Sequence, residues 1–142
     1  MKILLAVDGS RHSLAAVKCL IEHADWYREK PSVELVTVHL PVPKIRGMGR
    51  VISASQVRRY YDQQGNAALS KARKLLDAAG IPYSPRHLVG PVAESIVKQA
   101  KLTRCDLIMI GTRGMSAAAN LLLGSSATRV VSMSPIPVLL VK

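Results

Sequence analysis

The residues whose types and spacing suggest chemistry lie between Gly111 and Ser126, late in a chain of 142 residues. Gly111 follows a short apolar run, Gly114 comes three residues later, and Gly124 precedes Ser125 and Ser126. Glycine permits positive φ and lets a bulky ligand approach the main chain. A helix beginning at Ser125 would offer free N–H groups and the positive end of its dipole to an anion. The stretch indicates a phosphate cradle, but glycines that end a strand and a serine that caps a helix explain it equally well.

Composition favours one globular domain, residues 1–142, with anionic partners. No apolar run reaches the roughly 18–20 residues of a membrane helix. Asp8 interrupts the first apolar segment too early for a secretory signal, so we expect a cytoplasmic protein without membrane attachment. Cys19 and Cys105 have no metal or redox spacing and are expected to be thiols. The formal charge of +11 favours nucleotides, nucleic acid or an anionic surface, whereas 4% aromatic residues are few for stacking nucleic-acid bases.

The apolar pattern predicts strands alternating with helices. We expect strands near residues 2–7, 33–40, 81–89, 106–110 and 137–141, and helices near residues 10–26, 55–79, 91–102 and 125–133. The third strand contains Pro82 and Pro85, which favour an edge position. The inward stripes of the last two helices include Leu102 and, in the final helix, Val131 and Met133. Such alternation predicts an α/β fold with an open parallel sheet and helices on both faces.

In open parallel sheets, ligands bind beyond the carboxyl ends of the strands, at the point where strand order reverses. Asp8 ends the first predicted strand and Gly111 follows the fourth. If these strands are neighbours, Asp8, the turn after His39 and the glycine stretch converge on one crevice.

A basic segment interrupts this pattern. No acidic residue occurs between Glu34 and Asp62, while five basic residues do: Lys44, Arg46, Arg50, Arg58 and Arg59. A solvated loop and helix face, a mobile flap over an anionic ligand, and a nucleic-acid contact all explain this segment.

Four segments together resemble the universal stress protein family over nearly the whole chain: Ile3–Ser10, Thr37–Leu40, Asp106–Gly114 and Pro137–Val141. The glycine stretch fits that family's Gly-x2-Gly-x9-Gly-Ser/Thr nucleotide motif without a gap. The resemblance implies a five-stranded parallel sheet in the order 3-2-1-4-5, Rossmann-like and adenine nucleotide alpha hydrolase-like, with a site for ATP, with or without Mg²⁺.

The resemblance also implies which residues bind the nucleotide. They are Ala6, Val7, Asp8, Leu40, Ile110, Gly111, Arg113, Gly114, Gly124, Ser125, Ser126 and Ala127. The first three would lie at the adenine and ribose end, Leu40 and Ile110 at the base, Gly111 at the ribose, and the rest along the phosphates. Ser126 stands where the family often has an apolar residue, and Ala127 where it often has a hydroxyl, so one phosphate donor is displaced by a position.

The expected function is an ATP-binding stress-response protein, a homodimer through its C-terminal strand, with a protein partner that the sequence does not name. No Walker-type lysine or catalytic group is evident, so we expect at most slow ATP hydrolysis. One alternative is a basic module that binds nucleic acid or a protein partner without ATP; nucleic-acid binding would weaken steeply with salt. An adenylating enzyme is disfavoured, because Asp8-Gly9-Ser10-Arg11 replaces the Ser-Gly-Gly-x-Asp-Ser loop of such enzymes.

Overall fold

The described residues of the computed structural model, 1–41, 53–114 and 123–142, form a sheet of five parallel strands in the order β3-β2-β1-β4-β5. The strands are β1 (Lys2–Ala6), β2 (Ser32–His39), β3 (Tyr83–Val89), β4 (Leu107–Gly111) and β5 (Val138–Val141). The α-helices are α1 (Arg11–Glu22), α2 (Ala54–Ala78), α3 (Val92–Leu102) and α4 (Ser125–Met133). The expected α/β fold and strand order are confirmed. The basic residues 44, 46 and 50 lie outside the described residues.

The sheet is built around β1, which pairs with β2 on one side and β4 on the other. Ala6 lies opposite Val36 in β2 and opposite Ile110 in β4. The ends of β1 and β4 are therefore neighbours, which is the arrangement that the predicted crevice needs. Strand β3 lies at one edge of the sheet, the position that Pro85 favours.

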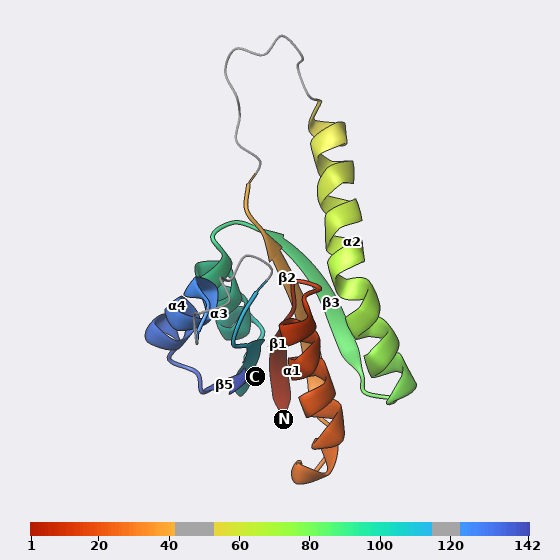
Figure 1. Cartoon of the computed structure of the whole chain (residues 1–142), viewed down its shortest axis with the longest axis vertical. Coiled ribbons are helices and arrows are strands. Elements are labelled where there is room, and N and C mark those ends of the chain that lie inside the picture. Colours follow the sequence, from red (N-terminus) through yellow and green to blue (C-terminus); the bar gives the residue numbers. More distant parts are fainter. Residues whose placement is uncertain (42–52, 115–122) are drawn as a thin grey trace.

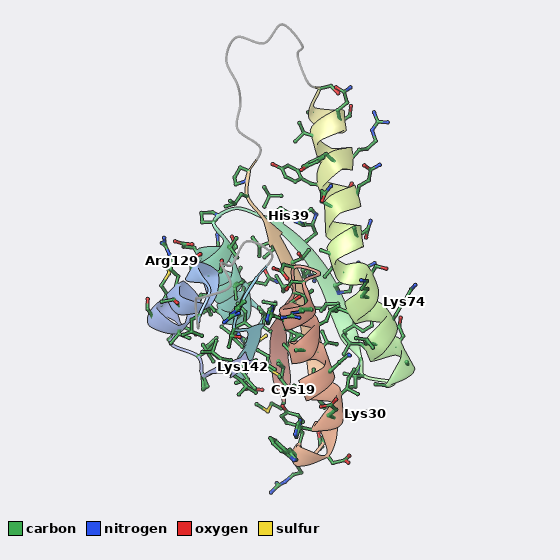
Figure 2. The ribbon with its side chains drawn as sticks, in the orientation of Figure 1. Cys19, Lys30, His39, Lys74, Arg129 and Lys142 are labelled. Atoms are coloured by element: carbon green, nitrogen blue, oxygen red, sulfur yellow. The ribbon has the colours of Figure 1, made fainter. Side chains whose placement is uncertain are left out.

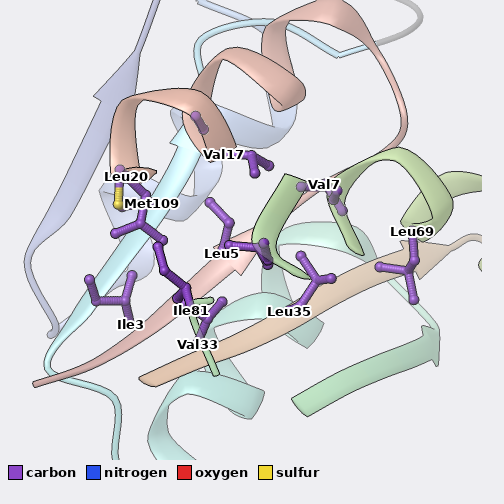
Figure 3. Close-up of a cluster of buried hydrophobic side chains, with 13 residues drawn as sticks. Ile3, Leu5, Val7, Val17, Leu20, Val33, Leu35, Leu69, Ile81 and Met109 are labelled. Carbon is purple, nitrogen blue, oxygen red and sulfur yellow. The ribbon is translucent and has the colours of Figure 1, made fainter. Parts of the chain in front are cut away.

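The molecule has three layers, with α1 and α2 on one face of the sheet and α3 and α4 on the other (Figure 1). Alternate residues of a strand point to opposite faces. Leu5 therefore packs beneath α1 and α2, in the cluster that Figure 3 shows. Its neighbours Leu4 and Ala6 pack beneath α3 and α4. Both faces of the central strand are buried, which explains its nearly continuous apolar sequence.

Local sequence explains where the first two α-helices begin. Ser10 accepts a hydrogen bond from the Ser13 N–H and caps α1. Ser53 and Gln56 form a reciprocal capping box at the start of α2. Helix α2 is long, and Figure 1 shows its N-terminal half extending beyond the sheet.

Three predicted inward residues point outward instead. Leu102 is the last residue of α3 and is 69% exposed, and Val131 and Met133 of α4 are also exposed. Helix α4 buries only Ala127 and Val130, because it covers the margin of the sheet, where a single row of side chains meets the core. Periodicity predicted the helices but overestimated the width of their buried faces.

Two remaining expectations concern the membrane and the cysteines. Within the described ranges, no helix is both long and apolar enough to cross a membrane. Cys19 and Cys105 are both free thiols, as expected.

Candidate functional site

A cavity of about 170 Å³ opens at the carboxyl ends of β1, β2 and β4, between α3 and α4. Its described lining residues are Ala6, Val7, Asp8, Ser13, Val36, Val38, Val92, Ile96, Ile110, Gly111, Thr112, Arg113, Gly114, Gly124, Ser125, Ser126 and Ala127. Strand order reverses here, since β1 leads to β2 on one side and β4 lies on the other. Open parallel sheets bind ligands at this position.

Hydrogen bonds fix the loop after β1. Gly9 has a φ of +82°, which reverses the chain between the strand and α1. The Asp8 carboxylate accepts the Ser10 N–H at 2.9 Å. The buried Ser13 hydroxyl accepts the Asp8 N–H at 3.3 Å and donates to the Ser10 carbonyl at 3.0 Å. The Asp8 side chain is thereby held at the rim of the cavity by local bonds.

The loop after β4 packs tightly against the start of α1. A Cβ built on Gly111 would lie 2.6 Å from the carbonyl oxygen of His12, so only glycine fits there. A Cβ on Gly114 would lie 2.8 Å from Oδ2 of Asp8. The Gly124 N–H donates to the Thr112 carbonyl at 2.7 Å, which ties the start of α4 to the end of the strand.

The N-terminus of α4 faces the cavity without a side-chain cap. Its N-cap is Gly124, in an extended conformation with φ −72° and ψ 155°, and no side-chain hydrogen bond caps the helix among the described residues. The first intrahelical bond runs from the Thr128 N–H to the Gly124 carbonyl. The N–H groups of Ser125, Ser126 and Ala127 therefore lack intrahelical acceptors, and all three residues line the cavity. Arg113 also lines the cavity, and together with these N–H groups it makes a candidate anion site.

Apolar residues that the sequence analysis did not assign to the site also line the cavity. Val36 and Val38 come from β2, and Val92 and Ile96 from the first turns of α3. The sequence does show that Val92 and Ile96 are spaced as neighbours on one helix face. Val36 lies beside Ala6 in the sheet, but this pairing depends on the strand register, which the sequence does not specify.

The structure brings together all of the nucleotide-binding residues that the sequence analysis proposed except Leu40. Leu40 is 67% exposed and is not among the residues that line the cavity. Its predicted contact with the base through backbone groups stays a prediction.

The family model of the universal stress proteins matches residues 1–142. The chain belongs to the universal stress protein family. A universal stress protein of Methanocaldococcus jannaschii is 32% identical over 142 residues, covering 99% of this chain and 81% of that relative.

Solved structures agree with this assignment. That of the hypothetical protein MJ0577 superimposes with a TM-score of 0.79 at 26% identity, and 99% of this chain covers 94% of that one. A universal stress protein in complex with cAMP superimposes with a TM-score of 0.67, also at 26% identity, with coverages of 99% and 94%.

The cavity thus combines an apolar lining with a cluster of N–H groups that can donate hydrogen bonds to an anion. An apolar slot suits a flat heterocycle, and uncapped amides suit phosphate oxygens. No group of three or more metal-ligating side chains occurs among the residues with described positions.

Proposed function

We propose that this cavity binds an adenine nucleotide, with ATP as the ligand that the glycine motif favours, and that binding serves a cytoplasmic stress response. The observation that carries the proposal is the start of α4, where uncapped main-chain N–H groups open into a cavity that apolar side chains also line. The base would lie against Val36, Val38 and Ile96, and the phosphates against Ser125 and its neighbours. The relative solved with cAMP supports this ligand class.

The donor set favours binding over rapid turnover. Asp8 is the one carboxylate among the described residues that line the cavity, and Arg113 is the one cationic side chain. Phosphoryl-transfer sites usually add a lysine, a positioned base and further carboxylates for Mg²⁺. A Mg²⁺ ion carried by the ATP phosphates needs only one or two protein carboxylates, so Asp8 is compatible with it. We therefore expect slow hydrolysis at most.

Mass analysis of nucleotide released by heat from freshly purified protein tests the proposal. We expect an adenine nucleotide in a near-stoichiometric amount, or binding of added ATP by equilibrium dialysis when purification removes it. If the protein neither releases a nucleotide nor binds added ATP, the proposed function is excluded.

A bulky residue at Gly114 provides a site-specific test. Gly114→Val would push its side chain against the Asp8 carboxylate at the cavity rim, so we expect nucleotide binding to be lost. Ala78→Val introduces the same side chain at an exposed position at the end of α2 and should bind like the unaltered protein. Equal binding by both variants would contradict the proposed site.

We also propose a homodimer formed through β5. This strand lies at the edge of the sheet, pairs with β4, and exposes Leu139, which is 40% accessible. Unpaired apolar strand edges tend to associate with one another. Such a dimer would place the two nucleotide sites on one particle and present a common surface to a protein partner.

A further inference from the structure

Two histidines contact each other on the sheet face that α2 covers, away from the nucleotide cavity. His39 ends β2, and His87 lies in β3, opposite Thr37 in the register. Nε2 of His87 lies 3.0 Å from Nδ1 of His39, and the rings meet edge to face with centroids 4.9 Å apart. This bond requires one nitrogen to donate a proton and the other to accept it. If both rings are protonated, two N–H groups face each other and the bond is lost.

Helix α2 lies directly on this histidine pair. A Cβ built on Gly65 would lie 2.5 Å from Cγ of His87, so glycine allows the helix to cross the ring. A glycine inside a helix costs about 1 kcal/mol relative to alanine, and the contact with His87 accounts for its presence. One turn earlier, the ring of Tyr61 lies 6.1 Å from that of His87.

The pair marks the point where α2 meets the sheet. Residues 54–64 of α2 are exposed or half-buried, and Gly65 is the first buried residue of the helix. Ala68, Leu69, Ala72 and Leu76 then pack on the sheet. Figure 2 labels His39 at the end of β2, level with the part of α2 that extends beyond the body. Displacement of His87 would therefore loosen the helix at its first docked turn.

The surroundings of the pair do not favour charge on His39. Burial and, to a smaller extent, the charge of His87 lower the pKa of His39 below its ordinary value of 6.5. From β2 the same face presents uncharged Thr37, and from α2 the contacting groups are Gly65 and the ring of Tyr61. Arg58 and Asp62 on α2 are exposed. No salt bridge found among the described residues includes either histidine.

We propose that the histidine pair is an acid-sensitive latch that fastens α2 to the sheet. At neutral pH the shared hydrogen bond holds His87 in the position over which Gly65 packs. When both rings carry a proton, the bond breaks, the like charges repel, and α2 loses its first docked turns. This proposal does not depend on nucleotide binding.

The direction of the pH effect follows from linkage. A lowered folded-state pKa means that the unfolded chain binds more protons than the folded chain as the pH falls through about 6.5. The contribution of His39 to stability is therefore complete above that pH and is lost as the pH falls toward the lowered value.

Hydrogen exchange of the full chain, measured at pH 7.5 and pH 5.5 and corrected for intrinsic exchange rates, tests the latch. We expect amides of residues 66–72 to lose protection at pH 5.5, while those of α1 keep theirs. In His87→Gln, an uncharged amide takes the place of the second imidazole, so no second cation can form beside His39 and the acid-induced loss should be smaller than in the unaltered protein. His23→Gln is the matched control, because His23 lies at the end of α1, beside Trp26, and the loss should persist.

Unchanged relative protection in the unaltered protein, or an equal loss in His87→Gln, would overturn the proposal. If His87→Gln does not fold, imidazole proton resonances of the unaltered protein give the answer. Two coupled titration steps, with α2 amides changing at the second, are expected. Independent titration of the two rings with no change in α2 would overturn the latch.

Discussion

At the scale of single residues, two glycines of the motif have different roles. Gly111 is required by packing, because a Cβ there would meet the His12 carbonyl oxygen at 2.6 Å. Gly124 has no such constraint, since a Cβ there would make ordinary contacts at 3.6 Å. One motif thus combines a glycine that the fold needs with a glycine that keeps a helix terminus uncapped.

The first of these roles predicts a loss of stability. Gly111→Ala should lower the free energy of unfolding by about 1–3 kcal/mol, because backbone atoms of α1 must move to accept the methyl group. Urea denaturation measures this difference. A change within about 0.5 kcal/mol, as is usual at permissive sites, would show that the contact with His12 relaxes freely.

The second role predicts that stability and binding separate. Serine at position 124 could accept hydrogen bonds from the first N–H groups of α4, in competition with a phosphate. Gly124→Ser should keep or raise the stability by a few tenths of a kcal/mol while weakening nucleotide affinity. Calorimetric titration beside urea denaturation checks both quantities. Unchanged affinity would show that these amides do not hold the phosphates.

The sequence predicted the glycine-rich side of the cavity better than its apolar side. Gly114, Gly124 and Ser125 are close in the chain, and their types indicate what they can do. Val38 and Val92 come from separate elements and carry no chemical signature, so only the register of β2 and the placement of α3 reveal them. Leu40, which the family resemblance assigns to the base, is not among the residues that line the cavity, and its contact with the base stays a prediction.

At the scale of elements, a buried carboxylate joins the β1–β2–β3 side of the sheet to α3. Glu34 of β2 is 2% exposed and accepts hydrogen bonds from Arg86 of β3 at 3.2 Å and Gln99 of α3 at 2.9 Å. Nζ of Lys2 in β1 lies 3.7 Å from its second oxygen. A buried charge without partners is costly, so these contacts also specify the strand register.

This cluster predicts unequal costs for two arginine substitutions. Arg86→Ala leaves the buried Glu34 short of a charged donor and should cost about 1–3 kcal/mol. Arg129→Ala breaks a pair with Glu94 between α4 and α3 whose side chains are 64% and 37% exposed, and should cost less than about 1 kcal/mol. Urea denaturation of both variants at one pH compares them. The reverse order of costs would contradict this interpretation of Glu34.

The succession of elements was predictable because strand and helix patterns alternate strongly and parallel crossovers have one hand. Which residues of each helix face the core was not predictable. Leu102 and Val131 fit an apolar stripe, yet both are exposed, since the margins of a sheet cover fewer rows of side chains than its centre. Periodicity along one helix contains no information about how much of the sheet lies beneath it.

At the scale of the whole molecule, the proposed dimer makes a prediction about mass. Sedimentation at micromolar concentration should give twice the 15.4 kDa of the chain. Leu139→Lys places a charge on the exposed β5 edge and should shift the protein toward the monomer. A monomer in the unaltered protein would exclude the dimer, and a dimer unaffected by the substitution would place the interface elsewhere.

The net charge of +11 belongs to this scale too. It raises the local concentration of any anionic ligand and does not by itself distinguish a nucleotide from a nucleic acid. The proposal of a nucleotide rests instead on the cavity, which is lined both by uncapped main-chain amides and by apolar side chains.

The most direct test is a crystal structure of the protein grown with millimolar ATP and Mg²⁺. The account predicts the adenine against Val36 and Val38, and phosphate oxygens within hydrogen-bond distance of the N–H groups of Ser125, Ser126 and Ala127. A cavity without nucleotide, or a nucleotide whose phosphates point away from α4, would contradict it.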